Sequence, residues 1–281
     1  MHINCGQYRF DLVTSDTAVR KAVQLVYGDC HAEHGVADFK ISLKPGSWLR
    51  RVIKPQVTFY SDQHAPFKPL PQSQAYATLE WGMNWCIAAH EFSRFLVHAA
   101  VLVKNGQAIL FPALPGSGKS TLSAYLGLTG WSVYSDEMAV IDTQTLEVLP
   151  LFRPVCVKNN SIDLVKQWHP SSIVTPVCRD TQKGDVAHVK VLDWLHYTQL
   201  QGAQITAVVF PKYVAGSELT IYQLTQLDAF AQLSKNAFNY NVLGAQAFDI
   251  VSKIVKSAKL FQLEHSNLAE LDEFLTNEVL R

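Results

Sequence analysis

The strongest constraint on the fold of this chain is the segment of residues 113–120, Ala-Leu-Pro-Gly-Ser-Gly-Lys-Ser. The apolar residues 108–111 before it are typical of a strand, and residues 121–126 after it are typical of a helix. A glycine loop between a strand and a helix can wrap a polyphosphate, because glycines let backbone N–H groups approach closely. The helix N-terminus adds partial positive charge. The alternative is an ordinary glycine-containing turn that caps a helix.

Two side chains of this loop have the chemistry that a nucleotide requires. Lys119 can reach the β- and γ-phosphates, and the hydroxyl of Ser120 can bind Mg²⁺. We therefore predict that the chain binds ATP together with magnesium. Ala113 stands where the pattern prefers glycine, which is a mild departure.

The charge balance and the apolar stretches argue against some partners. The 281 residues include 24 Lys and Arg against 24 Asp and Glu, whereas a general nucleic-acid binder is usually basic. The N-terminal residues hold no apolar stretch of signal-peptide length, and the apolar stretch 95–103 is too short to cross a bilayer. Five scattered cysteines suit a reducing compartment. We expect a cytoplasmic protein with no nucleic-acid partner and no membrane partner.

Two groups of residues have features of a metal site. The cluster of Cys30, His31, Glu33 and His34 holds ligand types but has no second half at zinc-site spacing, so it is either a zinc site or a solvated turn. His90-Glu91 begins like a metalloprotease motif, but position 94 is Arg instead of His, and this interpretation fails.

Prolines between residues 61 and 73 mark the clearest boundary along the chain. Before it, residues 8–13 and 52–60 are predicted strands and residues 17–27 a helix. After it, we predict a helix over 74–92, strands over 95–104 and 107–111 with a tight turn at Asn105-Gly106, and a helix after the glycine loop that ends near 127–130. The other predicted strands are 131–134, 139–142, 147–151, 205–210, 219–224 and 259–263, and the other predicted helices are 226–234, 246–258 and 268–279. The predicted class is mixed α/β (α+β).

Phosphoryl transfer needs a carboxylate near the phosphates, and Asp136-Glu137 supplies two. The pair follows the apolar residues 131–134 and lies 17 residues after Lys119. A strand beside the loop strand would carry the pair to the same end of the sheet, where it could anchor Mg²⁺ or take a proton from a hydroxyl. Two solvated acids in a turn are the alternative. His98, in the apolar stretch 95–103, is a second candidate, although such a histidine can also be a core residue.

The combination of His98-Ala, the glycine loop and Ser135-Asp-Glu, in this order and separation, resembles the catalytic core of the HPr kinase/phosphorylase and PEP carboxykinase superfamily. The closest resemblance is to the HPr kinase-related kinase A group, over roughly residues 5–275. Residues 153–163, 183–188, 210–212 and 238–240 look like further motifs of that group. The resemblance implies a P-loop core with a mostly antiparallel mixed sheet. With the boundary at the prolines, we predict an N-terminal αβ subdomain over 1–72 and a P-loop kinase domain over 73–281.

The resemblance also implies roles for single residues. Asp136 would be the acid/base at the substrate hydroxyl and a magnesium ligand with Ser120, His98 would support its charge state, and Glu137 stands where HPr kinases carry a second Asp. The Glu-Val-Arg-Gly signature of those kinases is not recognisable here, so Arg153, Lys158 or Lys183 is the hypothetical replacement. Lys183-Gly184 is predicted to lie on an exposed, mobile loop over 179–185 that closes over ATP. The predicted nucleotide-binding residues are Pro115, Gly116, Ser117, Gly118, Lys119, Ser120, Thr121, Arg153, Lys158 and Lys183.

The predicted function is therefore an ATP- and Mg²⁺-dependent kinase that phosphorylates a hydroxyl, with serine of a protein or peptide as the expected acceptor. The alternatives are a small-molecule kinase with the same core and a nucleotide-binding regulatory module with little turnover. The resemblance further implies a small peptide-binding partner protein. It leaves open a homo-oligomer, since the related enzymes are hexameric.

Overall fold

The computed structural model describes residues 1–30, 36–113 and 116–280. By its internal contacts the chain divides into two compact units. The first comprises residues 1–90 and 156–194, and the second comprises residues 91–155 and 195–281. The boundary predicted between residues 72 and 73 does not coincide with this division, because the helix that follows it and the segment 156–194 group with the N-terminal strands. The class is mixed α/β, with three sheets in the described residues.

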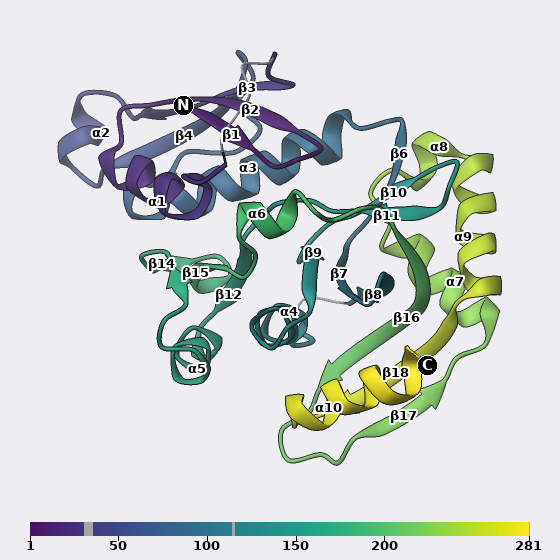
Figure 1. Ribbon diagram of the computed structural model, residues 1–281. Coiled ribbons are helices and arrows are strands. Elements are labelled where there is room, and N and C mark those ends of the chain that lie inside the picture. The colour runs from purple at the N-terminus through teal and green to yellow at the C-terminus, as the bar shows by residue number, and fades with distance from the viewer. Residues whose placement is uncertain (31–35, 114–115, 281) are drawn as a thin grey trace. The chain divides into compact units, whose positions relative to one another are not determined.

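The first unit contains a sheet with strand order β1-β2-β3-β4-β5 (Figure 1). The strands are β1 (His2–Asn4), β2 (Arg9–Thr14), β3 (Phe39–Pro45), β4 (Gln56–Ser61) and β5 (Leu70–Pro71), and only β2 and β3 pair in parallel. The strand predicted over 52–60 is wrong at its start, because α2 (Leu49–Val52) occupies that position. The 3₁₀ turn Gln72–Gln74 leads into α3 (Ala75–His90), which packs against β3, β4 and β5.

Helix α1 (Thr17–Tyr27) has the bounds that the sequence predicts. The carboxylate of Asp16 accepts hydrogen bonds from the N–H groups of Ala18 and Val19, at 2.8 and 3.0 Å, and so caps the helix. The buried residues of α1 recur at helical spacing and form one apolar face: Val19, Ala22, Val23, Val26 and Tyr27.

A second sheet of the first unit joins β12 (Val155–Lys158), β13 (Ile173–Val174), β14 (Cys178–Thr181) and β15 (Gly184–Lys190), and α5 (Asn160–Trp168) follows β12. Here the predicted loop over 179–185 is wrong. Strands β14 and β15 are antiparallel partners, with Cys178 opposite Val186 and Thr181 opposite Gly184. The hydroxyl of Thr181 donates to the Gly184 carbonyl at 2.6 Å and closes the turn. Lys183 therefore lies at the tip of a β-hairpin.

The second unit is built on a larger mixed sheet with the path β6-β10-β11-β16-β8-β7-β9, to which β18 is added beside β16 and β17 beside β18. Its strands are β6 (Arg94–Val97), β7 (Ala99–Lys104), β8 (Gln107–Pro112), β9 (Ser132–Ser135), β10 (Ala139–Asp142), β11 (Glu147–Leu149), β16 (Ala203–Tyr213), β17 (Thr220–Gln223) and β18 (Lys259–His265). Strand β16 pairs in parallel with β8 and β18 and antiparallel with β11.

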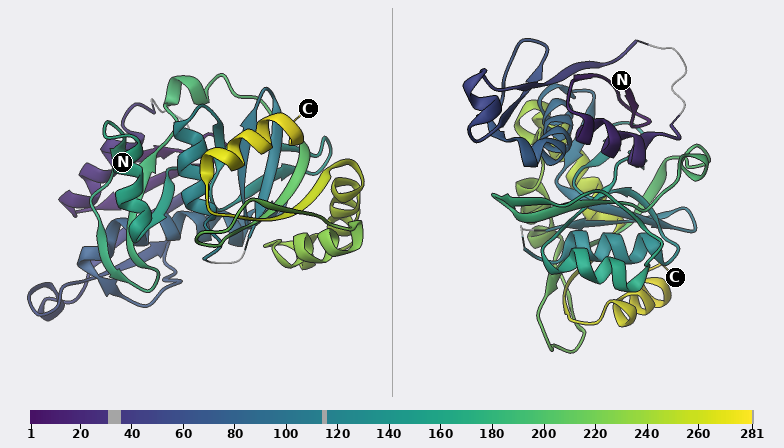
Figure 2. Two further views of the ribbon diagram at one scale, coloured as in Figure 1. Left: turned by 90° about the horizontal axis from the view of Figure 1, so that it is seen from below. Right: turned by 90° about the vertical axis from the view of Figure 1, so that its left-hand side faces the viewer.

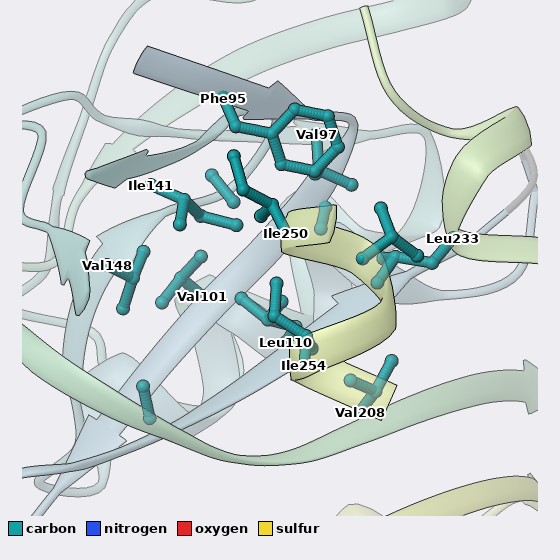
Figure 3. Close-up of a cluster of buried hydrophobic side chains, with 14 of the residues drawn as sticks. Phe95, Val97, Val101, Leu110, Ile141, Val148, Val208, Leu233, Ile250 and Ile254 are labelled. Atoms are coloured by element: carbon teal, nitrogen blue, oxygen red, sulfur yellow. The ribbon is translucent and has the colours of Figure 1, made fainter. Parts of the chain in front are cut away.

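Helices cover both faces of this sheet (Figure 1), and Figure 3 shows buried side chains between the sheet and one of these helices. The apolar side of α9 (Ala245–Ser257), with Ile250 and Ile254, packs with α7 (Gln226–Lys235) on the core formed by residues such as Val101, Leu110 and Val208. Helix α4 (Lys119–Leu128) packs against β7 and β9, and α10 (Leu268–Phe274) packs against α4. The remaining helices are α6 (Trp194–Tyr197), α8 (Tyr240–Leu243) and a π-helical end over Leu275–Val279.

The predicted hairpin turn is confirmed. Asn105 and Gly106 have φ of 53° and 74°, the left-handed pair that matches the twist of two antiparallel strands, and Lys104 pairs with Gln107. The continuous strand predicted over 95–104 is wrong, because it is divided at His98. The N–H of His98 donates to the carbonyl of Asn236 at 2.7 Å instead of to a neighbouring strand.

All five cysteines carry free thiols. In the part of the chain that the structure describes, no helix has both the length and the apolar character needed to cross a bilayer.

Candidate active site

The register of three strands brings His98, the glycine loop and the turn of Asp136 and Glu137 to one end of the larger sheet. Ala99 at the start of β7 pairs with Pro112 at the end of β8, and Val101 pairs with Ser135 at the end of β9. Because β7 is antiparallel to both neighbours, β8 and β9 end at the end of the sheet where β7 begins. The glycine loop follows β8, the turn of Asp136 and Glu137 follows β9, and His98 precedes β7.

The sequence predicted that the strand before Asp136 lies directly beside the strand before the glycine loop. In the structure β7 lies between these two strands, β9 and β8. The predicted consequence nevertheless holds, since two strands that flank a common antiparallel partner run in the same direction. The turn after β9 and the loop after β8 therefore leave the same end of the sheet.

The backbone of the loop has the conformation that its glycines permit. Gly116 and Gly118 both have φ of 89°, a left-handed conformation that L side chains rarely adopt. A Cβ on Gly118 would also lie 3.0 Å from the Cβ of Tyr213. Helix α4 begins at Lys119, and its N-cap residue Gly118 makes no side-chain capping hydrogen bond.

The side chain of His98 connects the loop to the carboxylate turn. Nε2 of His98 lies 3.3 Å from Nζ of Lys119, and Nδ1 of His98 lies 2.9 Å from the backbone oxygen of Glu137. A carbonyl only accepts and an ammonium only donates, so these partners assign the proton to Nδ1 and the lone pair to Nε2. His98 is thus a neutral imidazole that holds the loop lysine against the turn.

Asp136 is the most enclosed of the candidate carboxylates. It is 4% exposed, whereas Glu137 is half-buried and contacts His98 through its backbone. The hydroxyl of Ser135 accepts a hydrogen bond from the N–H of Met138 at 2.8 Å, which fixes the shape of this turn. Lys119 is also buried, at 8% exposed. A buried lysine and a buried carboxylate at one end of the sheet have the charges that phosphate binding and proton transfer require.

The other predicted residues are distributed over both units. Ser120 and Thr121 are half-buried in the first turn of α4, and Arg153 is half-buried just after Leu151, whose N–H donates to the carbonyl of Tyr134 at 2.8 Å. That bond brings the segment of Arg153 beside the end of β9. Lys158 and Lys183 belong to the first unit, where Nζ of Lys183 lies 5.3 Å from the centroid of the Trp81 ring. Pro115 lies outside the described residues.

The segment 236–239 positions His98, a role that sequence reasoning missed. Beyond the bond from His98 to Asn236, the N–H of Phe238 donates to the carbonyl of Leu96 at 2.9 Å. Buried Asn239 accepts from the N–H of Leu96 at 3.0 Å and donates to the carbonyls of Glu91 and Arg94 at 3.2 and 2.8 Å. These contacts join residues more than 140 positions apart. The local pattern of residues 238–240 carries no sign of them.

Replacing Asn239 with Ala should lower the free energy of unfolding by about 2–3 kcal/mol, because it leaves buried backbone groups of β6 without partners. Asn241→Ala, an exposed position in α8, is the matched control and should change stability by less than about 0.5 kcal/mol. Urea denaturation of both variants measures the difference. Equal effects would show that the contacts of Asn239 do not stabilise the region of His98.

The ends of β16 and β18 support the other side of the loop. The N–H of Tyr213 donates to the carbonyl of Ser117 at 2.9 Å, and the Tyr213 ring meets the ring of His265 edge-on at 6.0 Å. His265 is 1% exposed, and among the described residues neither of its ring nitrogens has a hydrogen-bond partner. Burial lowers the pKa of His265 below its ordinary value of 6.5. Its sequence neighbour Glu264 pairs with Lys212 instead.

This buried histidine predicts acid sensitivity of the second unit. Since the native pKa of His265 lies below 6.5, the unfolded state binds more protons under acid conditions, and stability should fall as the pH drops below 6.5. The slope from one such group is at most about 1.4 kcal/mol per pH unit. His265→Phe should flatten this part of the profile, and His2→Phe on the surface should not. Urea titrations from neutral pH into the acid range test it; parallel curves for wild type and His265→Phe would refute it.

No protein-family model and no curated protein matches the chain. Among the residues that the structure describes, no group of three or more His, Cys, Asp or Glu side chains could hold a metal ion. His31, Glu33 and His34 of the predicted zinc cluster lie outside the described residues.

Proposed function

We propose that this chain is an ATP- and Mg²⁺-dependent phosphotransferase that phosphorylates a hydroxyl group. The observation that carries the proposal is that His98 contacts both Lys119 and the backbone oxygen of Glu137, the residue after Asp136. These contacts lie at the end of the sheet where the glycine loop begins. The loop supplies backbone N–H groups for a polyphosphate, and Asp136 supplies a base. A pure nucleotide-binding module has no need of a base that faces the γ-phosphate.

The residues present fit a nucleotide. A Cβ built on Gly116 would meet nothing within 4 Å, so the backbone is open on that side, and the buried hydroxyl of Ser117 has no hydrogen-bond partner among the described residues. Residues 116–121 would hold the phosphates, with Lys119 on the β- and γ-phosphates and Arg153 of the same unit as a further candidate. Ser120 and Asp136 would hold Mg²⁺, which when bound neutralises charge on the phosphates.

The chain's own residues then perform the transfer. A bond forms between the acceptor oxygen and the γ-phosphorus, the bond from that phosphorus to the oxygen of ADP breaks, and the hydroxyl proton passes to Asp136. Lys119 stabilises the charge that develops on the phosphate oxygens. His98 keeps Lys119 in place and, being neutral, adds no competing positive charge. Lys119 and Asp136 are both buried, which limits the access of water to them.

The resemblance to the HPr kinase-related kinase A group supports the choice of acceptor. It favours a serine hydroxyl of a protein or peptide, while the lack of a recognisable Glu-Val-Arg-Gly signature argues against HPr itself. Free thiols at all five cysteines are consistent with a cytoplasmic location.

Labelled ATP tests the proposal. The pure protein is incubated with γ-labelled ATP and a lysate of its source, with Asp136→Asn as the matched inactive variant and EDTA as the metal control. We expect label on one protein or peptide, at serine, only with the wild type and magnesium. Binding of Mg·ATP without any transfer to lysate components would contradict a kinase and favour the regulatory module. Label on a small molecule would favour the alternative kinase.

A further inference from the structure

Strand β3 and its connection to β4 carry a concentration of positive charge in a chain whose charges balance overall. Residues 39–60 include Lys40, Lys44, Arg50, Arg51 and Lys54 and no Asp or Glu, whereas the whole chain has 24 residues of each sign. In the described part of the chain, the side chains of Lys40, Lys44, Arg50 and Lys54 are exposed and none has a carboxylate partner.

The same connection exposes large apolar side chains. Trp48, Leu49 and Ile53 are 80%, 47% and 58% exposed, and they lie within and beside the short helix α2. Figures 1 and 2 show α2 and its flanking residues as a tip that projects beyond the paired ends of β3 and β4. Exposed apolar residues that gather at one place mark a surface that a protein or membrane partner covers.

The sheet behind the tip continues the basic surface. Along β3, the buried Ile41 and Leu43 alternate with the exposed Lys40 and Lys44, so both lysines lie on the outer face. Nζ of Lys44 lies 4.7 Å from the centroid of the Tyr60 ring on that face. The exposed basic and apolar side chains therefore belong to one strand and the connection that follows it, and we name this set the β3–β4 surface: Lys40, Lys44, Trp48, Leu49, Arg50, Ile53 and Lys54.

We propose that the β3–β4 surface docks on an anionic lipid membrane. Lysine and arginine attract anionic headgroups, each strengthening binding by about fivefold, and Trp, Leu and Ile at the tip enter the boundary between headgroups and acyl chains. Such a contact needs no membrane-spanning helix. This proposal departs from the sequence-based expectation of no membrane partner, which rested on the lack of apolar stretches long enough for a signal peptide or a membrane span.

Two other anionic partners fit the surface less well. A peptide that adds a strand needs a sheet edge, but β3 and β4 are interior strands of the order β1-β2-β3-β4-β5. A nucleic acid offers phosphates to the lysines and bases to Trp48, but it offers nothing to Leu49 and Ile53, which are aliphatic. A projecting tip with both charge and aliphatic groups fits a lipid surface best.

Vesicle binding of the full chain tests this proposal, and no nucleotide is needed. The protein is sedimented with vesicles of phosphatidylcholine alone and of equal parts phosphatidylcholine and phosphatidylglycerol. We expect binding to the anionic vesicles only, with affinity falling as salt is added. Trp emission should shift to the blue on binding in the wild type, and this shift should be lost in Trp48→Phe.

Variants separate the β3–β4 surface from general charge. Arg50→Glu with Lys54→Glu should weaken vesicle binding at least tenfold, and Trp48→Ala at least fivefold. The matched controls are Lys235→Glu with Lys256→Glu, which reverse two exposed charges of the second unit, and Leu227→Ala, which shortens an exposed apolar residue there. The controls should bind as the wild type does.

Three results would overturn the proposal. The first is absence of binding to anionic vesicles at low salt. The second is equal weakening by the test and control variants, which would indicate general electrostatics. The third is tighter binding of poly-glutamate or single-stranded DNA than of vesicles, with loss in the same test variants, which would make the partner an acidic protein or a nucleic acid.

Discussion

Asp136→Asn is expected to lower phosphoryl transfer by about 10²–10⁴-fold while Mg·ATP still binds. A hydroxyl is a weak nucleophile, and Asn keeps the size and hydrogen bonding of Asp136 but cannot take its proton. Asp136 is 4% exposed beside the turn that His98 contacts, so water is a poor substitute for the missing base. Single-turnover transfer to the identified acceptor measures the effect.

Glu137→Gln is the control for this prediction. Glu137 neighbours Asp136 in the same turn, but it is half-buried and its contact with His98 is made by its backbone. It should therefore lose less activity than Asp136→Asn. A wild-type rate in Asp136→Asn, or a larger loss in Glu137→Gln, would reassign the base.

Lys119→Met is expected to reduce Mg·ATP affinity or turnover by orders of magnitude while the fold survives. Met matches the length and apolar stem of Lys119 and removes only the charge that contacts Nε2 of His98 and would contact the phosphates. Calorimetric titration with Mg·ATP and circular dichroism measure binding and folding separately. Lys235→Met, an exposed lysine of α7, is the matched control. Unchanged binding and activity in Lys119→Met would show that the loop does not hold phosphate.

Much of the second unit could be predicted because its signals are local. The Asn105-Gly106 turn, the glycine loop and the apolar face of α9 each depend on residues that are close together in the sequence. Asp16 and the spacing of apolar residues likewise set the bounds of α1. These features specify structure whatever the rest of the chain does.

The errors arose where distant partners decide the structure. Arg179 and Asp180 are exposed and polar, so β14 has no alternating pattern and exists because β15 pairs with it. The apolar stretch around His98 is uninterrupted in sequence, yet the bond to Asn236 divides it. For the site, spacing and resemblance indicated His98, Lys119 and Asp136, whereas the supporting contacts of Asn239 and Tyr213 depend on residues far along the chain.

The most direct test of the central claim is a crystal structure of the protein with Mg²⁺ and a non-hydrolysable ATP analogue. The account predicts β- and γ-phosphates against the backbone N–H groups of residues 116–121, with Lys119 on the γ-phosphate and Asp136 on the side open to an acceptor. A nucleotide bound elsewhere, or a γ-phosphate on the opposite side of the sheet from Asp136, would contradict it.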